Sequence, residues 1–237
     1  MRAPAVIAEV LRRPEAEPRP EPPPELGDLR FRALMTEKEW FSLPPAIRRR
    51  FSRRLAGGQT IAFAGEILES WMSGAGWWLA QAARLIGGPL PLTRDAQVRS
   101  RRSPAVRVAS MVTVTEDLAT GGQIWTRLYA RRKGFPQVIH SSKRFAGPTG
   151  LEEYVGRGVG MTLMVYARED ALVFRSKNYF LEFFGRRLYL PPWLTPGTIY
   201  VTHAELPDGK FSFTLQVFHP RFGLLIRQMA IFREIAP

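Results

Sequence analysis

The last third of the chain alternates between apolar and polar residues with a period of two, and this pattern constrains the fold more than any other feature. In the segment FSFTLQV (211–217) every odd position carries a large apolar residue and every even position a polar one, as a half-buried strand requires. The preceding turn PDGK (207–210) contains Asp208 and Gly209, a typical hairpin dipeptide. We therefore predict an antiparallel meander at this end of the chain.

Similar alternation recurs further upstream, with short turns between the segments. Several short strands joined in this way favour an antiparallel sheet that curves into a barrel or forms a sandwich. We predict an α+β fold with about nine strands, barrel-like or sandwich, and two or three helices packed on the sheet. The candidate strands cover residues 58–70, 105–117, 122–131, 135–145, 159–167, 171–183, 198–206, 211–219 and 224–234.

The N-terminal part of the chain has a different character. Residues 1–27 hold seven prolines and five glutamates, which predicts a disordered Pro/Glu-rich tail, so we expect a single β-rich domain over residues 28–237. Helical spacing predicts a short helix after Asp28, a second from Ser42 to Gly57, and a third over residues 74–86. The second helix would expose five arginines between residues 48 and 54, either as a solvated face or as a docking surface for an acidic partner or lipid.

Charge and composition narrow the classes of function. The net charge of +13 is scattered, and no nucleic-acid-binding motif accompanies it, so nucleic acid is not expected as a partner, whereas peripheral contact with an anionic membrane stays open. The absence of cysteine excludes disulfides and thiolate chemistry and favours a reducing compartment. We find no signal-peptide core or membrane span in the sequence and expect a cytoplasmic protein.

The segment IWTRLYAR (124–131) is the most informative candidate site. In a strand, Trp125, Arg127 and Tyr129 would share one face, and such a row can line a cavity with aromatic walls and an arginine anchor for an anionic head group. In the alternative, Arg127 pairs with a nearby carboxylate such as Glu153 and simply completes the barrel.

Other candidates for chemistry are few. His140 or Glu153 could act as an acid or base in an enzyme, and His203 would share a strand face with Glu205. We assign no catalytic residue, no metal site and no cofactor. The segment LYLPPWLTPG (188–197) contains three prolines, so we interpret it as a corner between strands, with Trp193 as a plug over one end of the sheet.

The order of several short motifs resembles the bacterial family called domain of unknown function 4166. The motifs include LPPAIRR, ARLIGGPLP, IWTRLYA, LEEYVG, GRRLYLPPWLTPG and HPRFGLLIRQMA, and together they span about residues 29–234. The resemblance implies a domain found alone or fused to reductase modules similar to saccharopine dehydrogenase, and hence a Rossmann-type reductase as a partner. The family's W-x-R pattern falls on Trp125 and Arg127, and its E-x-x-G pattern falls on Glu153 and Gly156.

The sequence departs from the family pattern at Tyr129, where phenylalanine is more usual, and the family brings no established activity. From these observations we predict a non-catalytic module that binds a hydrophobic or amphipathic small molecule, such as a lipid or isoprenoid, in a curved-sheet cavity. Trp125, Arg127, Tyr129, His140, Glu153 and Trp193 are the predicted ligand-binding residues. An enzyme acting on such a substrate and a basic membrane-surface or protein-interaction module are the alternatives.

Overall fold

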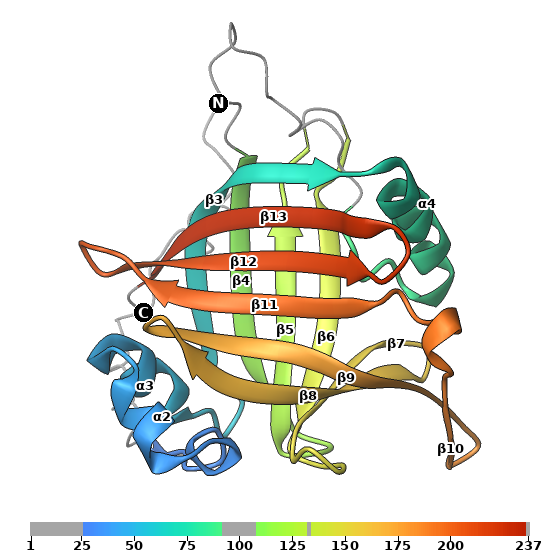
Figure 1. Cartoon of the computed structure of the whole chain (residues 1–237). Helices are drawn as coiled ribbons and strands as arrows, with labels where there is room; N and C mark the ends of the chain where they lie inside the picture. The colour runs from blue at the N-terminus through green and yellow to red at the C-terminus, as the bar shows by residue number, and fades with distance from the viewer. Residues whose placement is uncertain (1–25, 92–107, 132–133, 236–237) are drawn as a thin grey trace, which may run out of the picture.

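A closed antiparallel barrel dominates the computed structural model, which describes residues 26–91, 108–131 and 134–235. The ring contains ten strands, and each strand pairs with the next in the order β9, β11, β12, β13, β3, β4, β5, β6, β7, β8 and back to β9 (Figure 1). The ring strands are β3 (Thr60–Met72), β4 (Val108–Asp117), β5 (Gly122–Tyr129), β6 (Gln137–Arg144), β7 (Glu152–Gly156), β8 (Val159–Arg168), β9 (Ala171–Phe183), β11 (Thr198–Glu205), β12 (Lys210–His219) and β13 (Gly223–Glu234).

Strand β9 closes the ring. Along one edge it pairs with β8, and along the other it pairs first with β11 and then with the short strand β10 (Arg186–Tyr189). A ring of ten strands is wider than one of eight, in which the inward side chains just fill the interior. Closure in this form therefore leaves room for a cavity among inward-facing side chains.

The predicted fold class is confirmed, and the barrel form holds rather than the sandwich. The predicted number of about nine strands is slightly low, because strand β7 was missed. This strand is only five residues long, its first two residues are glutamates that are both buried, and a bulge after Tyr154 interrupts its register with β8. None of these features gives the alternation from which strands are predicted.

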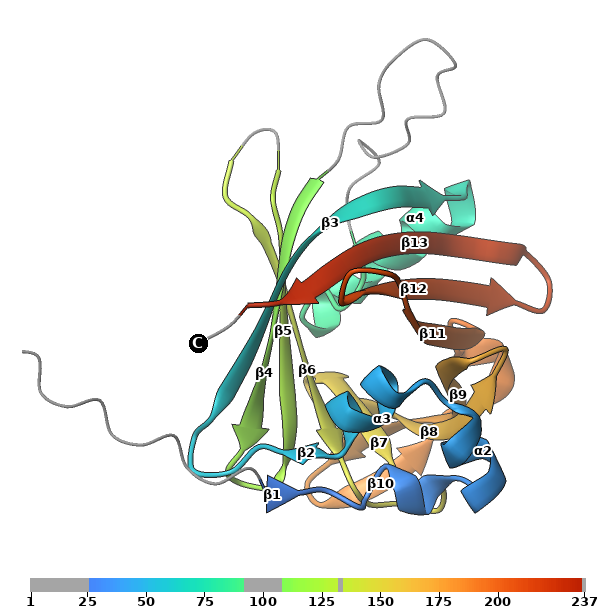
Figure 2. The same cartoon turned by 90° about the vertical axis from the view of Figure 1, so that its left-hand side faces the viewer.

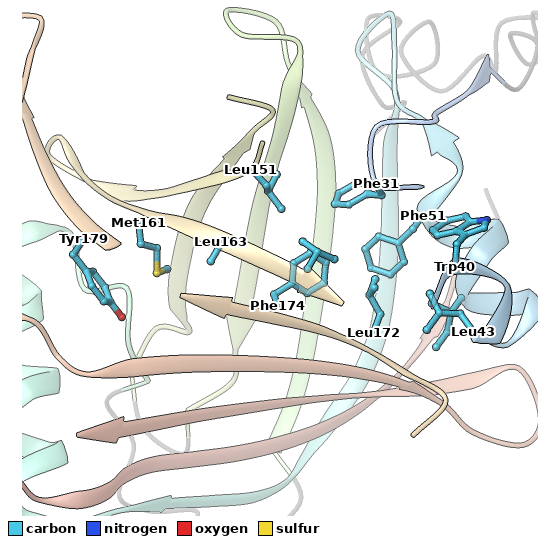
Figure 3. Packing of buried hydrophobic residues seen from close by; sticks show 12 residues of the cluster. Phe31, Trp40, Leu43, Phe51, Leu151, Met161, Leu163, Leu172, Phe174 and Tyr179 are labelled. Carbon is cyan, nitrogen blue, oxygen red and sulfur yellow. The ribbon is translucent and has the colours of Figure 1, made fainter. Parts of the chain in front are cut away.

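Two short helices pack against one end of the barrel. They are α2 (Glu37–Ser42) and α3 (Pro45–Phe51), which follow the 3₁₀ turn η1 (Arg32–Leu34). Their buried Trp40 and Phe51 belong to one hydrophobic cluster with Leu163, Leu172 and Phe174 of strands β8 and β9 (Figure 3). Figure 2 shows the two helices beside this end of the sheet. The helices therefore cover the barrel interior at this end.

The predicted helix from Ser42 to Gly57 is wrong at both ends. Ser42 is the last residue of α2, and α3 ends at Phe51, after which strand β2 (Arg53–Arg54) pairs with β1 (Leu26–Gly27). Leu55, which the predicted helix would contain, is buried in a second cluster with Phe63 and Ile67 of β3. The chain must leave the helix to reach that cluster, which explains the early end. Of the tail predicted over residues 1–27, residues 1–25 lie outside the described residues, whereas Leu26 and Gly27 form strand β1.

A capping box fixes the start of α2. The Thr36 side chain accepts a hydrogen bond from the Glu39 backbone at 3.3 Å, and the Glu39 carboxylate accepts one from the Thr36 backbone at 2.9 Å. We expect Thr36→Ala to lower the free energy of unfolding by about 1 kcal/mol in urea denaturation. The control Lys38→Ala, in the same helix, should change it by less than about 0.5 kcal/mol. Equal effects of the two substitutions would contradict the role of the cap.

Helix α4 (Gly74–Ala83), which continues as the 3₁₀ turn η2 (Arg84–Ile86), lies at the opposite end of the barrel, as Figure 1 shows. Its position agrees with the predicted helix over residues 74–86. Ala80 and Ala83 pack with Leu225 and Ile226 at the start of β13, in a third hydrophobic cluster. No helix in the described part of the chain is long and apolar enough to span a bilayer.

Candidate functional site

The barrel interior contains a cavity of about 440 Å³. Most of its lining is apolar, and it runs from inward-facing strand residues such as Trp125 and Phe232 to residues of α4, the 86–91 segment and the turn η3 (Pro192–Leu194). Ala82 and Leu194 line the cavity and are also exposed at the surface. The cavity therefore opens at the α4 end of the barrel, opposite the end covered by α2 and α3.

Three charged side chains meet on one wall of this cavity. They project from consecutive strands: Arg127 from β5, Lys143 from β6 and Glu153 from β7. The Lys143 Nζ lies 3.0 Å from Glu153 Oε1, and Arg127 Nη2 lies 3.5 Å from the same oxygen. Arg127 also donates a hydrogen bond to Ser141 Oγ at 3.2 Å. We call Arg127, Lys143 and Glu153 the charged cluster.

The charged cluster contains one ionised carboxylate. Burial alone would raise the pKa of Glu153, but the charges of Lys143 and Arg127 and hydrogen bonds from Ser141 and Lys143 outweigh it and lower the pKa to about 2. Burial lowers the pKa of the Lys143 amine, and Arg127 acts in the same direction while Glu153 opposes it. The cluster is therefore neutral or singly positive near neutral pH, which suits an acidic ligand better than a basic one.

Aromatic rings lie beside the lysine of the charged cluster. The Lys143 Nζ lies 4.9 Å from the ring centre of Trp125, a cation–π distance. The Trp125 indole N–H donates to Gln123 Oε1 at 3.1 Å, which fixes the ring against the wall. Tyr129 also lines the cavity, and burial raises the pKa of its hydroxyl, so it stays protonated. The Phe174 ring lies on the same amine, with its centre 5.7 Å from Lys143 Nζ.

The structure brings four of the six predicted ligand-binding residues together: Trp125, Arg127, Tyr129 and Glu153 all line the cavity. The predicted pairing of Arg127 with Glu153 is also present. The two interpretations of this row, as a cavity wall and as an internal ion pair, are thus compatible. Arg127 keeps 24% of its side chain accessible, so it retains surface for a ligand.

The other two predicted residues lie elsewhere. His140 is exposed on the outer face of β6, where its Nδ1 lies 3.0 Å from Thr126 Oγ1, because Ile139 and Ser141 take the inward positions on either side. Trp193 is 76% exposed and does not line the cavity, whereas its neighbour Leu194 does. The 192–194 turn is a corner at the cavity opening, as its prolines predicted, but the tryptophan does not plug it.

The sequence predicted that His203 and Glu205 share a strand face, and in the structure Arg50 contacts both of them. Arg50 Nη1 lies 2.7 Å from His203 Nε2 and 3.2 Å from Glu205 Oε2. Burial and the nearby Arg50 lower the pKa of His203 well below its usual value, so the ring is neutral. Arg50 therefore points inward from α3, contrary to the prediction of an outer arginine face. No group of three potential metal ligands occurs among the described residues.

Lys143 is the important residue that sequence reasoning missed. In QVIHSSKR (137–144) polar residues occur on both faces of the strand, so the pattern does not reveal which face is buried. The register between β6 and β7 could have revealed it, because Lys143 lies directly opposite Glu153 on the neighbouring strand.

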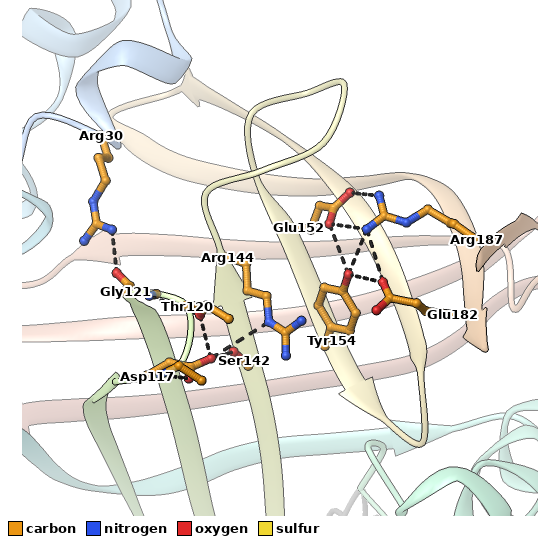
Figure 4. Close-up of polar contacts among 12 residues, drawn as sticks. Arg30, Asp117, Thr120, Gly121, Ser142, Arg144, Glu152, Tyr154, Glu182 and Arg187 are labelled. Atoms are coloured by element: carbon orange, nitrogen blue, oxygen red, sulfur yellow. Dashed lines mark hydrogen bonds and ion pairs between the residues drawn. The ribbon is translucent and has the colours of Figure 1, made fainter. Parts of the chain in front are cut away.

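Glu152, the neighbour of Glu153, points to the other face of β7 and belongs to a separate network. Arg187 Nη2 on β10 donates to Glu152 Oε2 at 3.1 Å and to the Tyr154 hydroxyl at 2.8 Å (Figure 4). The same hydroxyl donates to Glu182 Oε2 at 2.8 Å on β9. This network ties β7 to the β9–β10 hairpin and thereby holds Glu153 in its inward position.

We compared the chain with models of known protein families. A family model described as "Domain of unknown function (DUF4166)" matches residues 43–232, which run from just before α3 almost to the end of the barrel strand β13. The chain belongs to this family. The resemblance drawn from the order of the motifs is thereby confirmed, and the charged cluster and the cavity lie within the matched DUF4166 region. No curated protein and no solved structure matches the chain.

Proposed function

We propose that this DUF4166 domain is a non-catalytic binding module for a small amphipathic molecule that has an apolar body and an acidic head group. The observation that carries the proposal is the charged cluster on the wall of an otherwise apolar cavity. A volume of about 440 Å³ is in the usual range for small-molecule sites. Lipids and isoprenoids with an acidic end belong to this class.

The head group would bind at Arg127. Lys143 is the closer partner of Glu153, at 3.0 Å against 3.5 Å for Arg127, and the arginine keeps free donors on the cavity side. A guanidinium can hold a carboxylate through two parallel hydrogen bonds, and such charge-assisted bonds are the strong ones. The apolar body would then extend along Trp125 and the α4 end of the cavity toward the opening.

A matched pair of ligands tests this proposal. We expect dodecanoic acid to displace dansyl-labelled undecanoic acid from the full chain at about tenfold lower concentration than dodecanol, which differs only in its head group. In Arg127→Met the preference for the acid should fall below about twofold. The variant should still fold, because Lys143 and Glu153 remain paired. The control Arg175→Met, on the outer face of β9, should keep the full preference.

Two results would contradict the proposal. If neither ligand displaces the probe, the cavity does not take an apolar molecule. If the acid and the alcohol compete equally well in the unmodified protein, the cavity binds apolar molecules but the charged cluster does not select an acidic head group.

The enzyme alternative receives less support. It requires two titratable groups that converge in one pocket with pKa values suited to proton transfer. His140 lies on the outer face, and Glu153 is held as a carboxylate by two cations. We propose instead that the domain presents its ligand to a separate protein, for which the family resemblance suggests a Rossmann-type reductase, and that it acts in the cytoplasm, in keeping with a chain that contains no cysteine.

A further inference from the structure

The end of the barrel at which the cavity opens carries an unusual concentration of exposed hydrophobic side chains. It consists of four segments, residues 72–91, 156–159, 182–197 and 218–224, which we call the opening face. Half of the large hydrophobic side chains that are exposed in the described part of the chain lie in these segments. They include Trp78, Leu85, Phe184, Trp193, Leu194 and Phe222. Exposed apolar residues gathered in this way mark an interaction surface.

Backbone contacts hold the four segments side by side. Ser73 N donates to Leu225 O at 2.9 Å, and Glu182 N donates to Gly158 O at 2.8 Å. A Cβ atom at Gly156 would overlap with the carbonyl oxygen of Ile86, and one at Gly197 would overlap with that of Phe218. Figure 1 shows α4, the β12–β13 turn and β10 along the same end of the barrel. The exposed residues therefore belong to one face.

The charge of this face is almost entirely positive. Arg84, Arg157, Arg186 and Arg221 are exposed there. The only acidic residue in the four segments is Glu182, and it is already engaged by Arg187 and Tyr154. Aromatic side chains interspersed with arginines suit the boundary between anionic lipid head groups and acyl chains. A second copy of the chain would bring two positive faces together, which electrostatic repulsion disfavours.

The opening face is also continuous with the cavity. Leu194 contributes to both, because it is exposed at the surface and lines the cavity. Ala82 and Ile86, close to the exposed Trp78 and Leu85 in sequence, line the cavity as well. An apolar molecule could therefore pass from a lipid layer into the barrel without crossing water.

We propose that the opening face docks on the surface of an anionic lipid bilayer. Docking requires only the exposed apolar side chains and the arginines, and it places the cavity opening against the lipid. That the cavity exchanges its ligand with the bilayer at this point rests on the proposed function. The site differs from the arginines of residues 48–54 considered from the sequence, of which Arg50 and Arg53 form ion pairs with Glu205 and Glu234.

Co-sedimentation with vesicles, carried out without any added fatty acid, tests the docking. We expect the full chain to bind vesicles of phosphatidylcholine and phosphatidylglycerol in equal parts, and to bind phosphatidylcholine alone at least about tenfold more weakly. Arg186→Glu combined with Arg221→Glu should weaken binding to the anionic vesicles at least about 25-fold, which is about fivefold for each arginine. The matched control is Arg49→Glu combined with Arg168→Glu, which reverses exposed charges away from the opening face and should keep at least about half of the binding.

A second pair of variants tests the apolar contribution. Trp193→Ser combined with Phe184→Asn should reduce binding about tenfold, and asparagine is chosen because residue 184 has a left-handed backbone with φ of 47°. Leu118→Ser combined with Leu29→Ser removes similarly exposed side chains at the other end of the barrel and should have no effect. Unchanged thermal unfolding verifies that each variant folds.

Several outcomes would overturn the docking proposal. One is the absence of binding to anionic vesicles, and another is a greater loss with Arg49→Glu and Arg168→Glu than with the opening-face pair. Concentration-dependent dimers that the Trp193 and Phe184 substitutions abolish, without vesicle binding, would assign the face to a second copy instead. Because no ligand enters this assay, its failure leaves the displacement experiment on the cavity unaffected.

Discussion

Glu153→Gln is expected to lower the free energy of unfolding by about 3 kcal/mol at neutral pH, measured by urea denaturation. Glutamine has the same shape as glutamate but no charge, so Lys143 would remain buried beside Arg127 without its carboxylate. Removing one partner of a buried ion pair is costly because the remaining charge is left uncompensated in a medium of low polarity. The amine can lose its proton, but deprotonation also has a free-energy cost.

The same carboxylate predicts a dependence on pH. Its pKa in the folded protein, about 2, lies below its ordinary value of 4.5. The stabilisation is therefore fully present above pH 4.5 and is lost as the pH falls through the range down to about 2. The difference amounts to about 3 kcal/mol. The unmodified protein should lose this stability on acidification, whereas Glu153→Gln should not, so the two unfolding curves should converge at low pH.

Two further variants control this prediction. Glu205→Gln removes the less buried pair with Arg50 and should cost less, about 1 kcal/mol. Replacing both Lys143 and Glu153 by methionine should recover part of the stability lost in Glu153→Gln, because the double variant no longer contains a buried lysine without its carboxylate. If the double variant is less stable than the single one, the loss does not arise from the uncompensated lysine.

Ala230→Phe is expected to weaken binding of the dansyl-labelled fatty acid at least about a hundredfold, without loss of stability. Ala230 projects from β13 into the cavity, next to the rings of Trp125 and Phe232. A larger side chain in a well-packed core causes strain, but one that enters an existing cavity gains apolar contacts. The affinity for the probe should therefore fall, while the free energy of unfolding stays the same or rises.

The neighbouring residue provides the control. Met229 lies on the other face of β13 and does not line the cavity, so Met229→Phe should leave the affinity for the probe unchanged. Fluorescence titration and urea denaturation measure the two quantities on the same samples. Retention of full affinity in Ala230→Phe would show that the probe binds outside the barrel, and it would remove the basis of the proposed function.

The sequence predicted those parts of the barrel in which each strand has one apolar and one polar face. Strand β12 is such a case, and β5 was placed correctly because Trp125 and Tyr129 mark its inner side. Strand β7 was missed because its two buried glutamates, Glu152 and Glu153, contradict the expected pattern. Each is compensated by cations from other strands, and such long-range pairs depend on sheet order, which local patterns do not contain.

The candidate site was predictable in part for the same reason. The Trp125 and Arg127 row follows from the alternation of one strand, whereas Lys143 depends on the register of two more. His140 was chosen for its chemistry, and a shift of one residue decides whether a strand side chain faces the cavity or the solvent. The opening face escaped prediction because its residues come from four segments that are far apart in the sequence.

The pairing of β3 with β13 also has a consequence for biosynthesis. It joins residues 63–72 to residues 226–234, so the barrel closes only after the last described strand has emerged from the ribosome. Until then β3 presents an unpaired edge, and the apolar lining of the future cavity faces the surrounding solution, where chaperones and other nascent chains can reach it. Substitutions in the lining can therefore change the cellular yield of the protein through its nascent form, independently of any effect on the ligand.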